Sequence, residues 1–279
     1  HIVVNEGVTT IGGFAFHTCL NLETVALPST LTTIENGAFY NCQMPSMTLP
    51  NGLQTIDDHA FEKSGLTTLI VPNSVTKIGA SAFESCVRLT SITLSNGINR
   101  LEEKVFAYCW GLLSLDIPAG VTTIESQALY NCSKLRCVTI PNGVVDIAGR
   151  AFNACYVLDK IILPASVQNI GSCVFEDSPL LHVFCRGTVP PSADETAFGT
   201  EITSVATLHV PDNGTSVATY SAAPVWREFS RIMGDDGDGT AVENVTDKQQ
   251  SKVVKIIEEG KIFILRNGVK YDLNGRQLQ

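Results

Sequence analysis

The sequence has few basic residues and no long apolar run. Lys and Arg together number 19 against 28 Asp and Glu, which gives a formal net charge of −9. A protein that binds nucleic acid or an anionic membrane needs a basic face, and none is apparent here. The longest apolar runs are far too short to span a bilayer. The composition therefore argues against nucleic acid as a partner and against a membrane span.

Patterns that mark catalytic and metal sites are also missing. The sequence contains no His-Glu-x-x-His, no Gly-x-Ser-x-Gly and no phosphate-binding glycine loop. It has no Cys-x-x-Cys, and zinc needs several ligands that converge on one point. We therefore predict a protein that is not an enzyme, with no catalytic residue, metal or cofactor. A hydrolase with an unrecognised site is the weakest alternative. The five histidines are scattered: His1, His17, His59, His182 and His209.

A phrase of 22 or 23 residues repeats along most of the chain. It reads Ile-x-x-x-Ala-Phe-x-x-Cys-x-x-Leu-x-x-Val-x-Leu-Pro from Ile11. A fixed period in the twenties predicts a solenoid, in which each turn buries its apolar side by stacking on its neighbours. The opening aliphatic residue recurs at Ile11, Ile34, Ile56, Ile78, Leu101, Ile124, Ile147 and Ile170.

Each repeat is predicted to contain three segments. The Leu-x-x-Val-x-Leu-Pro part alternates apolar and polar residues, as a short half-buried strand does, and its proline ends the strand. The Val-Thr-x-Ile part predicts a second short extended piece. The Ala-Phe-x-x-Cys-x-x-Leu part has apolar residues three apart, which favours one helical or 3₁₀ turn. Strands stacked in register would form a parallel sheet with about 4.8 Å between turns.

Most of the nine cysteines occupy one position of the repeat. Because free cysteine behaves as a small apolar residue, we interpret this series as a buried packing column. An odd count also excludes a set in which every cysteine forms a disulfide. Cys137 lies outside the column and is a candidate exposed thiol, whereas Cys185 falls at a buried strand position. The column consists of Cys19, Cys42, Cys86, Cys109, Cys132 and Cys155, with Ser64 and Ser178 in the same place.

Four regions follow from where the repeats weaken. Residues 1–186 hold about eight repeats, and 187–233 are predicted to be a degenerate last repeat and cap, with Trp226 and Phe229 covering the last turn. The polar composition of 234–252 indicates a linker. Residues 253–279 contain strand-like stretches with Asn-Gly turns, which predict a small antiparallel hairpin module.

The phrases resemble the BspA-like leucine-rich repeats of bacterial surface proteins. The resemblance rests on Ile-Gly-Gly-Phe-Ala-Phe-His-Thr-Cys at 11–19, on Ile-Gly-Ala-Ser-Ala-Phe-Glu-Ser-Cys at 78–86, and on the Leu-x-x-Val-x-Leu-Pro strands. It implies a β-rich, α/β-type leucine-rich repeat solenoid of right-handed turns with a parallel sheet. Such proteins are secreted or surface-attached and bind other proteins, often host matrix or neighbouring cells. The segment Tyr271-Asp272-Leu273-Asn274-Gly275-Arg276 resembles a C-terminal sorting module, although it lacks the longer strand set of such modules.

Two columns of side chains flank the buried residue of each predicted strand. In the early repeats these columns hold mostly Ser and Thr, which simply suit exposed strand positions. Toward the C-terminal repeats they become more varied, and exposed apolar groups beside polar ones favour a binding patch. The alternative is that Ile162 and Phe184 are buried under the cap. The candidate partner-binding residues are Asp116, Cys137, Thr139, Lys160, Ile162, His182 and Phe184.

These observations favour a non-catalytic, adhesin-like protein that binds an extracellular protein or glycoprotein through the solenoid surface. The alternative is a structural spacer that presents another domain and has no ligand of its own. A patch of protruding side chains favours the binder, and a uniformly small polar face favours the spacer. The chain opens within a repeat, at Val8-Thr9-Thr10-Ile11. We therefore expect the natural N-terminus to lie upstream and the protein to be extracellular or on a bacterial cell surface.

Overall fold

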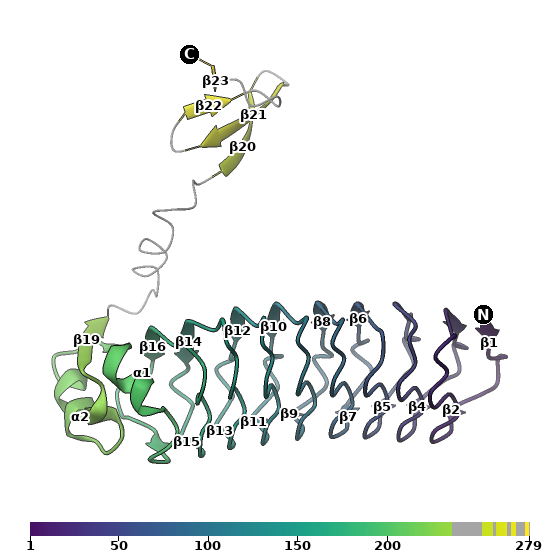
Figure 1. Ribbon diagram of the computed structural model, residues 1–279, viewed down its shortest axis with the longest axis horizontal. Helices are drawn as coiled ribbons and strands as arrows, with labels where there is room; N and C mark the ends of the chain where they lie inside the picture. The colour runs from purple at the N-terminus through teal and green to yellow at the C-terminus, as the bar shows by residue number, and fades with distance from the viewer. Residues whose placement is uncertain (236–252, 259–260, 267–268, 272–276, 279) are drawn as a thin grey trace. The chain divides into compact units, whose positions relative to one another are not determined.

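The computed structural model describes residues 1–235, 253–258, 261–266, 269–271 and 277–278. The chain divides into two compact units, His1–Gly234 and Asp235–Gln279. The first unit is a β-solenoid of about ten turns built from parallel strands (Figure 1). The solenoid predicted from the 22- and 23-residue repeat is therefore confirmed.

The Leu-x-x-Val-x-Leu part of each repeat forms the first row of strands. Partners in this row come from adjacent repeats, so that Leu69 pairs with Ile92 and Leu115 with Val138. In β6, β8, β10 and β12 the middle residue is buried and both neighbours are exposed. The row comprises β1 (Ile2–Val3), β3 (Val25–Ala26), β6 (Thr68–Ile70), β8 (Ser91–Thr93), β10 (Ser114–Asp116), β12 (Cys137–Thr139), β14 (Lys160–Leu163), β16 (His182–Cys185), β18 (Thr207–Pro211) and β19 (Arg231–Asp235).

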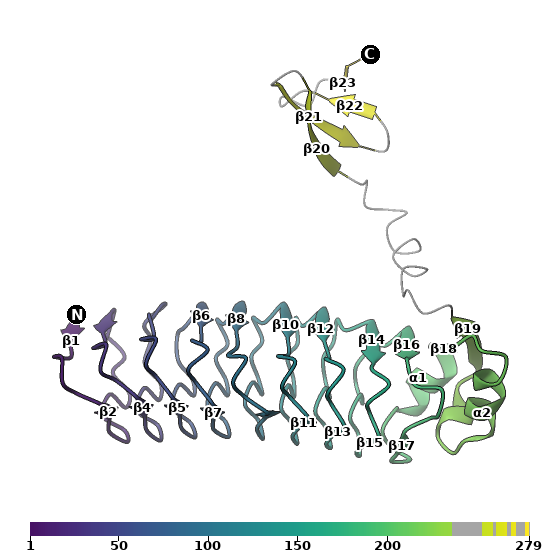
Figure 2. The same ribbon diagram turned by 180° about the vertical axis from the view of Figure 1, so that it is seen from behind.

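The Val-Thr-x-Ile part forms the second row, along the other edge of each turn (Figures 1 and 2). Its strands have two residues each, and the aliphatic residue always faces the core, as in the Ile34–Ile56 and Ile56–Ile78 pairs. The row comprises β2 (Thr10–Ile11), β4 (Thr33–Ile34), β5 (Thr55–Ile56), β7 (Lys77–Ile78), β9 (Arg100–Leu101), β11 (Thr123–Ile124), β13 (Asp146–Ile147), β15 (Asn169–Ile170) and β17 (Ser192–Ala193).

The first row is interrupted between β3 and β6, where residues 46–48 form no strand. In the following repeats the residue before the strand donates its N–H to the previous turn, as Thr90 does to the Thr67 carbonyl and Leu113 to the Thr90 carbonyl. Pro45 holds this place in the interrupted repeat. A proline has no N–H, so this bond between turns cannot form there.

The helical or 3₁₀ turn predicted for Ala-Phe-x-x-Cys is not found. The segment instead forms consecutive β-turns in which Ser81 and Ser85 adopt left-handed φ values of 54° and 57°. Every second N–H group closes one of these turns; the Cys86 N–H, for example, donates to the Phe83 carbonyl. The N–H groups between them donate to the next repeat, as the Phe83 N–H does to the Val105 carbonyl. A helix would direct these donors within its own segment. The bonds between repeats therefore explain why spacing alone suggested the wrong local structure.

Two columns of side chains fill the centre of the solenoid. Successive phenylalanine rings stack with centroids 5.4 to 5.6 Å apart, as in Phe39–Phe61, Phe61–Phe83 and Phe83–Phe106. Beside them, each buried cysteine of the column donates its thiol to a carbonyl of the previous turn; the Cys109 sulfur, for example, lies 3.1 Å from the Phe83 oxygen. The predicted packing column of cysteines is confirmed. Each thiol adds a second hydrogen bond to a carbonyl that already accepts a backbone N–H, as the Phe83 carbonyl does from Cys86.

Among the described residues, helical segments occur only after the regular repeats. They are α1 (Thr200–Val205), α2 (Ser216–Ala222) and the 3₁₀ helix η1 (Trp226–Glu228). The rings of Trp226 and Phe229 lie edge-on against Phe198, the last ring of the column, with centroids 5.4 and 5.2 Å from it. No described helix has the length and apolar character needed to cross a membrane.

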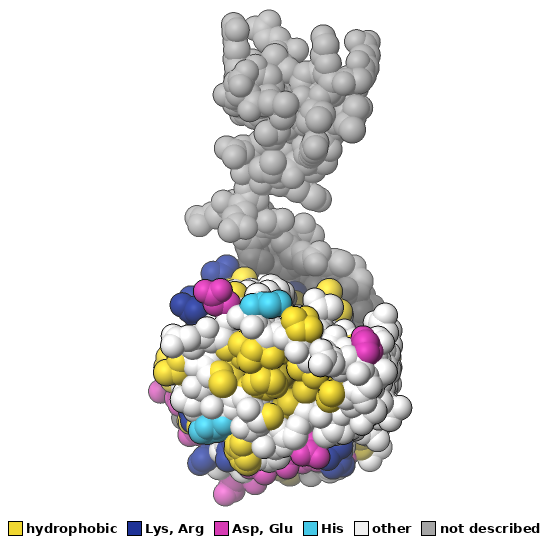
Figure 3. Space-filling view, turned by 90° about the vertical axis from the view of Figure 1, so that its right-hand side faces the viewer, with side chains coloured by type: hydrophobic (Ala, Val, Ile, Leu, Met, Phe, Trp, Pro, Cys, Tyr) yellow, Lys and Arg dark blue, Asp and Glu magenta, His cyan; other side chains and the backbone are white. Residues whose placement is uncertain are grey.

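Among the described residues, no such layer covers the opposite end of the first unit. Figure 3 looks at this end and shows hydrophobic side chains gathered at its centre. Val3, Phe14 and Leu20 are exposed there, and Phe16 is only partly buried although it stacks on Phe39 at 5.0 Å. An end turn has a neighbour on one side only, which accounts for this exposure.

In the second unit, strands β20 (Val253–Glu258), β21 (Lys261–Arg266), β22 (Val269–Tyr271) and β23 (Gln277–Leu278) pair antiparallel in sequence order. Both Asn-Gly turns, at 267–268 and 274–275, lie outside the described residues, as does most of the predicted linker. The division of the chain into repeats, cap, linker and hairpin module stays a prediction.

Candidate functional site

The predicted site residues lie on the outward side of the first row, from β10 to β16. Register places Asp116 beside Thr139, and the Thr139 hydroxyl donates to the Asp116 carboxylate at 2.7 Å. Further along, Lys160 pairs with His182 and Ile162 with Phe184. Asp116, Cys137, Thr139 and Ile162 are exposed, whereas Lys160 and His182 are half-buried. Six of the seven residues therefore reach the surface of one face.

Phe184 is the exception, because its side chain is fully buried. The His209 ring from β18 stacks on it, with centroids 4.2 Å apart and planes 12° from parallel. The Arg186 guanidinium lies 5.3 Å from the centroid of the same ring. Phe184 therefore supports this face from within and cannot contact a partner directly, which corrects its prediction as a surface residue.

His209 also contacts His182, and the pattern of repeats did not reveal this pair. The Nδ1 atom of His182 and the Nε2 atom of His209 lie 3.0 Å apart, a hydrogen bond in which one ring donates and the other accepts. Burial lowers the pKa of His182; Asp159 opposes this shift, whereas Lys160 and Arg231 add to it. Burial and the two nearby cations therefore both favour the neutral form of His182 at pH 7.

A hollow of about 750 Å³ extends the same face toward the N-terminal repeats. Its lining includes Ile70, Thr93 and Asp116 from three successive strands, together with Asn73 and Asn96 from the following turns. Ile70 is 73% exposed, in a column where the neighbouring repeats hold polar residues. An apolar residue at an outward position could therefore have indicated this hollow from the sequence. The columns of the early repeats are less uniform than their Ser and Thr content suggested.

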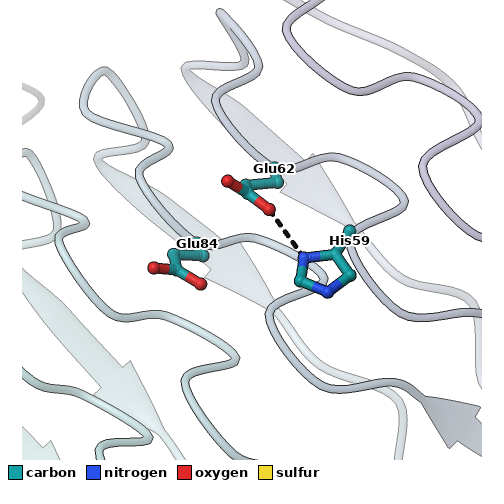
Figure 4. Close-up of side chains that lie close together, drawn as sticks. All are labelled: His59, Glu62 and Glu84. Carbon is teal, nitrogen blue, oxygen red and sulfur yellow. Dashed lines mark hydrogen bonds and ion pairs between the residues drawn. The ribbon is translucent and has the colours of Figure 1, made fainter. Parts of the chain in front are cut away.

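A group of possible metal ligands lies elsewhere, on the turn segments of two repeats. His59, Glu62 and Glu84 place one ligand atom each within 4.8 Å of one another (Figure 4). The Glu62 carboxylate is already engaged, however, by His59 Nδ1 at 2.6 Å and by Lys63 Nζ at 2.9 Å. A zinc ion would need each ligand about 2.0–2.2 Å away and would have to compete with both contacts. The Glu62 carboxylate is thus already occupied by side chains of its own repeat.

The thiols of the solenoid differ sharply in accessibility. Burial raises the pKa of Cys42 to about 11 and those of Cys86, Cys155 and Cys185 to about 12. Cys137, by contrast, is exposed on β12. Because thiolate and access together set the rate of thiol reactions, a disulfide reagent should modify Cys137 well before the buried cysteines of the core.

Mass spectrometry of the partly labelled protein checks this expectation. The Cys137→Ser variant should lose the fast phase, and the buried thiols should react only after denaturant is added. Fast labelling of Cys86 or Cys109 in the folded protein would contradict the buried column.

The comparisons with known proteins agree with this architecture. The family model described as "BspA type Leucine rich repeat region" matches residues 1–112 and 99–222, in six copies. A leucine-rich repeat protein from Bacteroides ovatus ATCC 8483 superposes with a TM-score of 0.69 at 22% identity, over 84% of this chain and 60% of that protein. The T. pallidum leucine-rich repeat protein TpLRR gives a TM-score of 0.54 at 29% identity, over 56% and 76% of the two chains.

This chain thus spans about 60% of the length of the Bacteroides protein, and that likeness concerns the fold alone. No curated protein matches the sequence. The family model, however, covers well over half of the chain. The chain belongs to the family of BspA-type leucine-rich repeat proteins.

Proposed function

We propose that this chain is a non-catalytic, secreted or cell-surface protein that binds an extracellular protein or glycoprotein, in the manner of an adhesin. The observation that supports the proposal is the outward face of the first row. It carries side chains of varied chemistry at fixed spacing, including Ile70, Asp116, Cys137, Lys160 and Ile162. Solenoids bind extended partners along such faces, through many small contacts.

The backbone beneath this face is well suited to hold its side chains still. Strand pairs β10–β12, β14–β16 and β16–β18 align in register, and the aliphatic residues between the outward positions are buried. Every buried side-chain nitrogen or oxygen in the described residues has a hydrogen-bond partner. A rigid face loses little entropy on binding, so modest contacts are enough for a measurable affinity.

Charge and apolar surface meet at the C-terminal part of the face. Lys160 and Ile162 alternate along β14, with His182 beside Lys160 and the buried Phe184 beside Ile162. Mixed patches of this kind are typical of protein interfaces, which combine apolar contact area with a polar rim. We place the centre of the proposed interface at Lys160, Ile162 and His182, with Asp116, Cys137 and Thr139 at its margin.

Direct binding to a panel of matrix proteins and mucosal glycoproteins tests this proposal. We expect saturable binding to at least one member, and a loss of about tenfold or more in affinity for the double variant Lys160→Glu, Ile162→Ser, because both changes fall at the centre of the interface. Phe184 is left intact because truncating a buried ring would destabilise the repeat itself.

The matched control is Lys104→Glu, which makes the same change of charge on a turn segment away from this face. It should bind like the unaltered protein, and melting curves should show all three proteins equally folded. Absence of saturable binding across the panel would contradict the proposal and favour a structural spacer. Equal losses of affinity in the double variant and in Lys104→Glu would show that the interface does not lie at β14.

A further inference from the structure

A second hollow lies on a different side of the solenoid, where the last regular turns meet α1. Its volume is about 640 Å³. It is bounded by the turns that precede β14 and β16 and by the helix that follows β17. The lining residues are Tyr156, Glu176 to Leu181, Gly199 to Ile202, and Val205.

The walls of this hollow are apolar and exposed. Tyr156, Leu181 and Val205 come from three separate segments and are 53%, 50% and 64% exposed. The buried side chains of Leu180 and Ile202 line the hollow beside them. Single exposed apolar residues are common on protein surfaces, but several that line one concave site mark a site of interaction.

The charged residues of the hollow are all acidic. Glu176, Asp177 and Glu201 line it, and none of its lining residues is Lys, Arg or His. Among the described residues, no basic side chain forms an ion pair with these three carboxylates. The Glu176 carboxylate accepts a hydrogen bond from the neutral side-chain amide of Asn153, at 3.0 Å. The hollow therefore presents an apolar surface within a negative field that is not balanced locally.

We propose that this hollow binds a segment of a partner protein in which an apolar side chain is flanked by Lys or Arg. The apolar side chain would contact Tyr156, Leu181 and Val205, and the flanking cations would lie against the three carboxylates. The complementarity of charge identifies the occupant, since a negative rim repels nucleic acids, anionic lipid surfaces and acidic peptides. This surface is separate from the outward face of the first row, so the inference goes beyond the function proposed above.

A short synthetic peptide tests the proposal directly. The probe is fluorescein-labelled Lys-Arg-Leu-Phe-Leu-Arg-Lys, compared with a peptide in which Glu replaces each cation and with one in which Ser replaces Leu and Phe. Fluorescence anisotropy at about 50 mM salt, where charges are weakly screened, should show saturable binding of the first peptide only. Binding should weaken as salt is added, because part of the interaction is between exposed charges.

Two double variants separate the contributions of charge and of apolar contact to peptide binding. Glu176→Gln with Asp177→Asn removes two charges; asparagine tolerates the left-handed φ of 59° at position 177, and glutamine keeps an acceptor for Asn153. Tyr156→Ser with Val205→Ser removes exposed apolar surface. Each pair should weaken binding of the first peptide by about tenfold, as expected when central contacts of an interface are lost.

Two control proteins test whether the effect belongs to the hollow. Glu23→Gln with Glu103→Gln removes the same number of charges elsewhere, and Lys160→Glu, Ile162→Ser alters the outward face of the first row. Both should bind the peptide as the unaltered protein does. Equal binding of the acidic peptide, or affinity that neither hollow variant changes, would overturn the proposal. So would self-association of the protein that these variants abolish, because the occupant would then be a second copy of this chain.

Discussion

Replacing Phe83 with alanine is expected to lower the free energy of unfolding by about 3–5 kcal/mol, as is found for large-to-small changes in well-packed cores. The ring is fully buried and stacks on Phe61 and Phe106, with centroids 5.5 and 5.6 Å away. Both neighbours are held in place by their own turns, so the cavity cannot close by a local shift. The substitution therefore weakens the packing between three successive repeats.

Denaturant unfolding followed by circular dichroism measures this effect, with hydrogen exchange to locate it. Ser91→Ala, on the exposed side of the adjacent strand β8, is the control and should change stability by less than about 0.5 kcal/mol. An unfolding transition that Phe83→Ala leaves unchanged would contradict a core built from stacked rings. Because long repeat arrays can unfold in parts, the exchange data should show the loss around β6 to β9 first.

The stacking of repeats could be predicted from the sequence because residues that lie one period apart in the sequence are also strand partners in the sheet. Ile34, Ile56 and Ile78 are separated by 22 residues each and pair with one another directly. Once the aliphatic residue of each repeat is aligned, the outward neighbours are aligned too. The contact between Asp116 and Thr139 follows from this register, since 23 residues separate them.

Two features could not be decided from the sequence because no single repeat contains their cause. Apolar residues three apart fit a helical turn as well as consecutive β-turns, and the choice is made by N–H groups that donate to the next repeat. The burial of Phe184 depends on His209, which lies 25 residues further on and not 22 or 23. The last repeat is stretched by α1 and the segment before it, so the period could not identify this partner.

Replacing Trp226 with alanine is expected to destabilise the C-terminal turns by about 3–5 kcal/mol, while the N-terminal turns keep their stability. The indole is almost fully buried, and its N–H donates to the Pro191 carbonyl at 2.8 Å. Its ring contacts Phe198 and Tyr220, with centroids 5.4 Å from each. Without it the last phenylalanine of the column loses its cover, and Pro191 loses its hydrogen bond.

Hydrogen exchange distinguishes this outcome from a general loss of stability. In a solenoid each turn contacts only its neighbours, so protection should fall in β15 to β18 and remain unchanged in β2 to β7. The other tryptophan of the chain provides the control. Trp110 is 48% exposed, and Trp110→Ala should leave protection unchanged throughout. Equal loss at both ends of the solenoid in Trp226→Ala would show that the turns unfold as one unit, and that the aromatic cap protects the whole stack and not only its last turns.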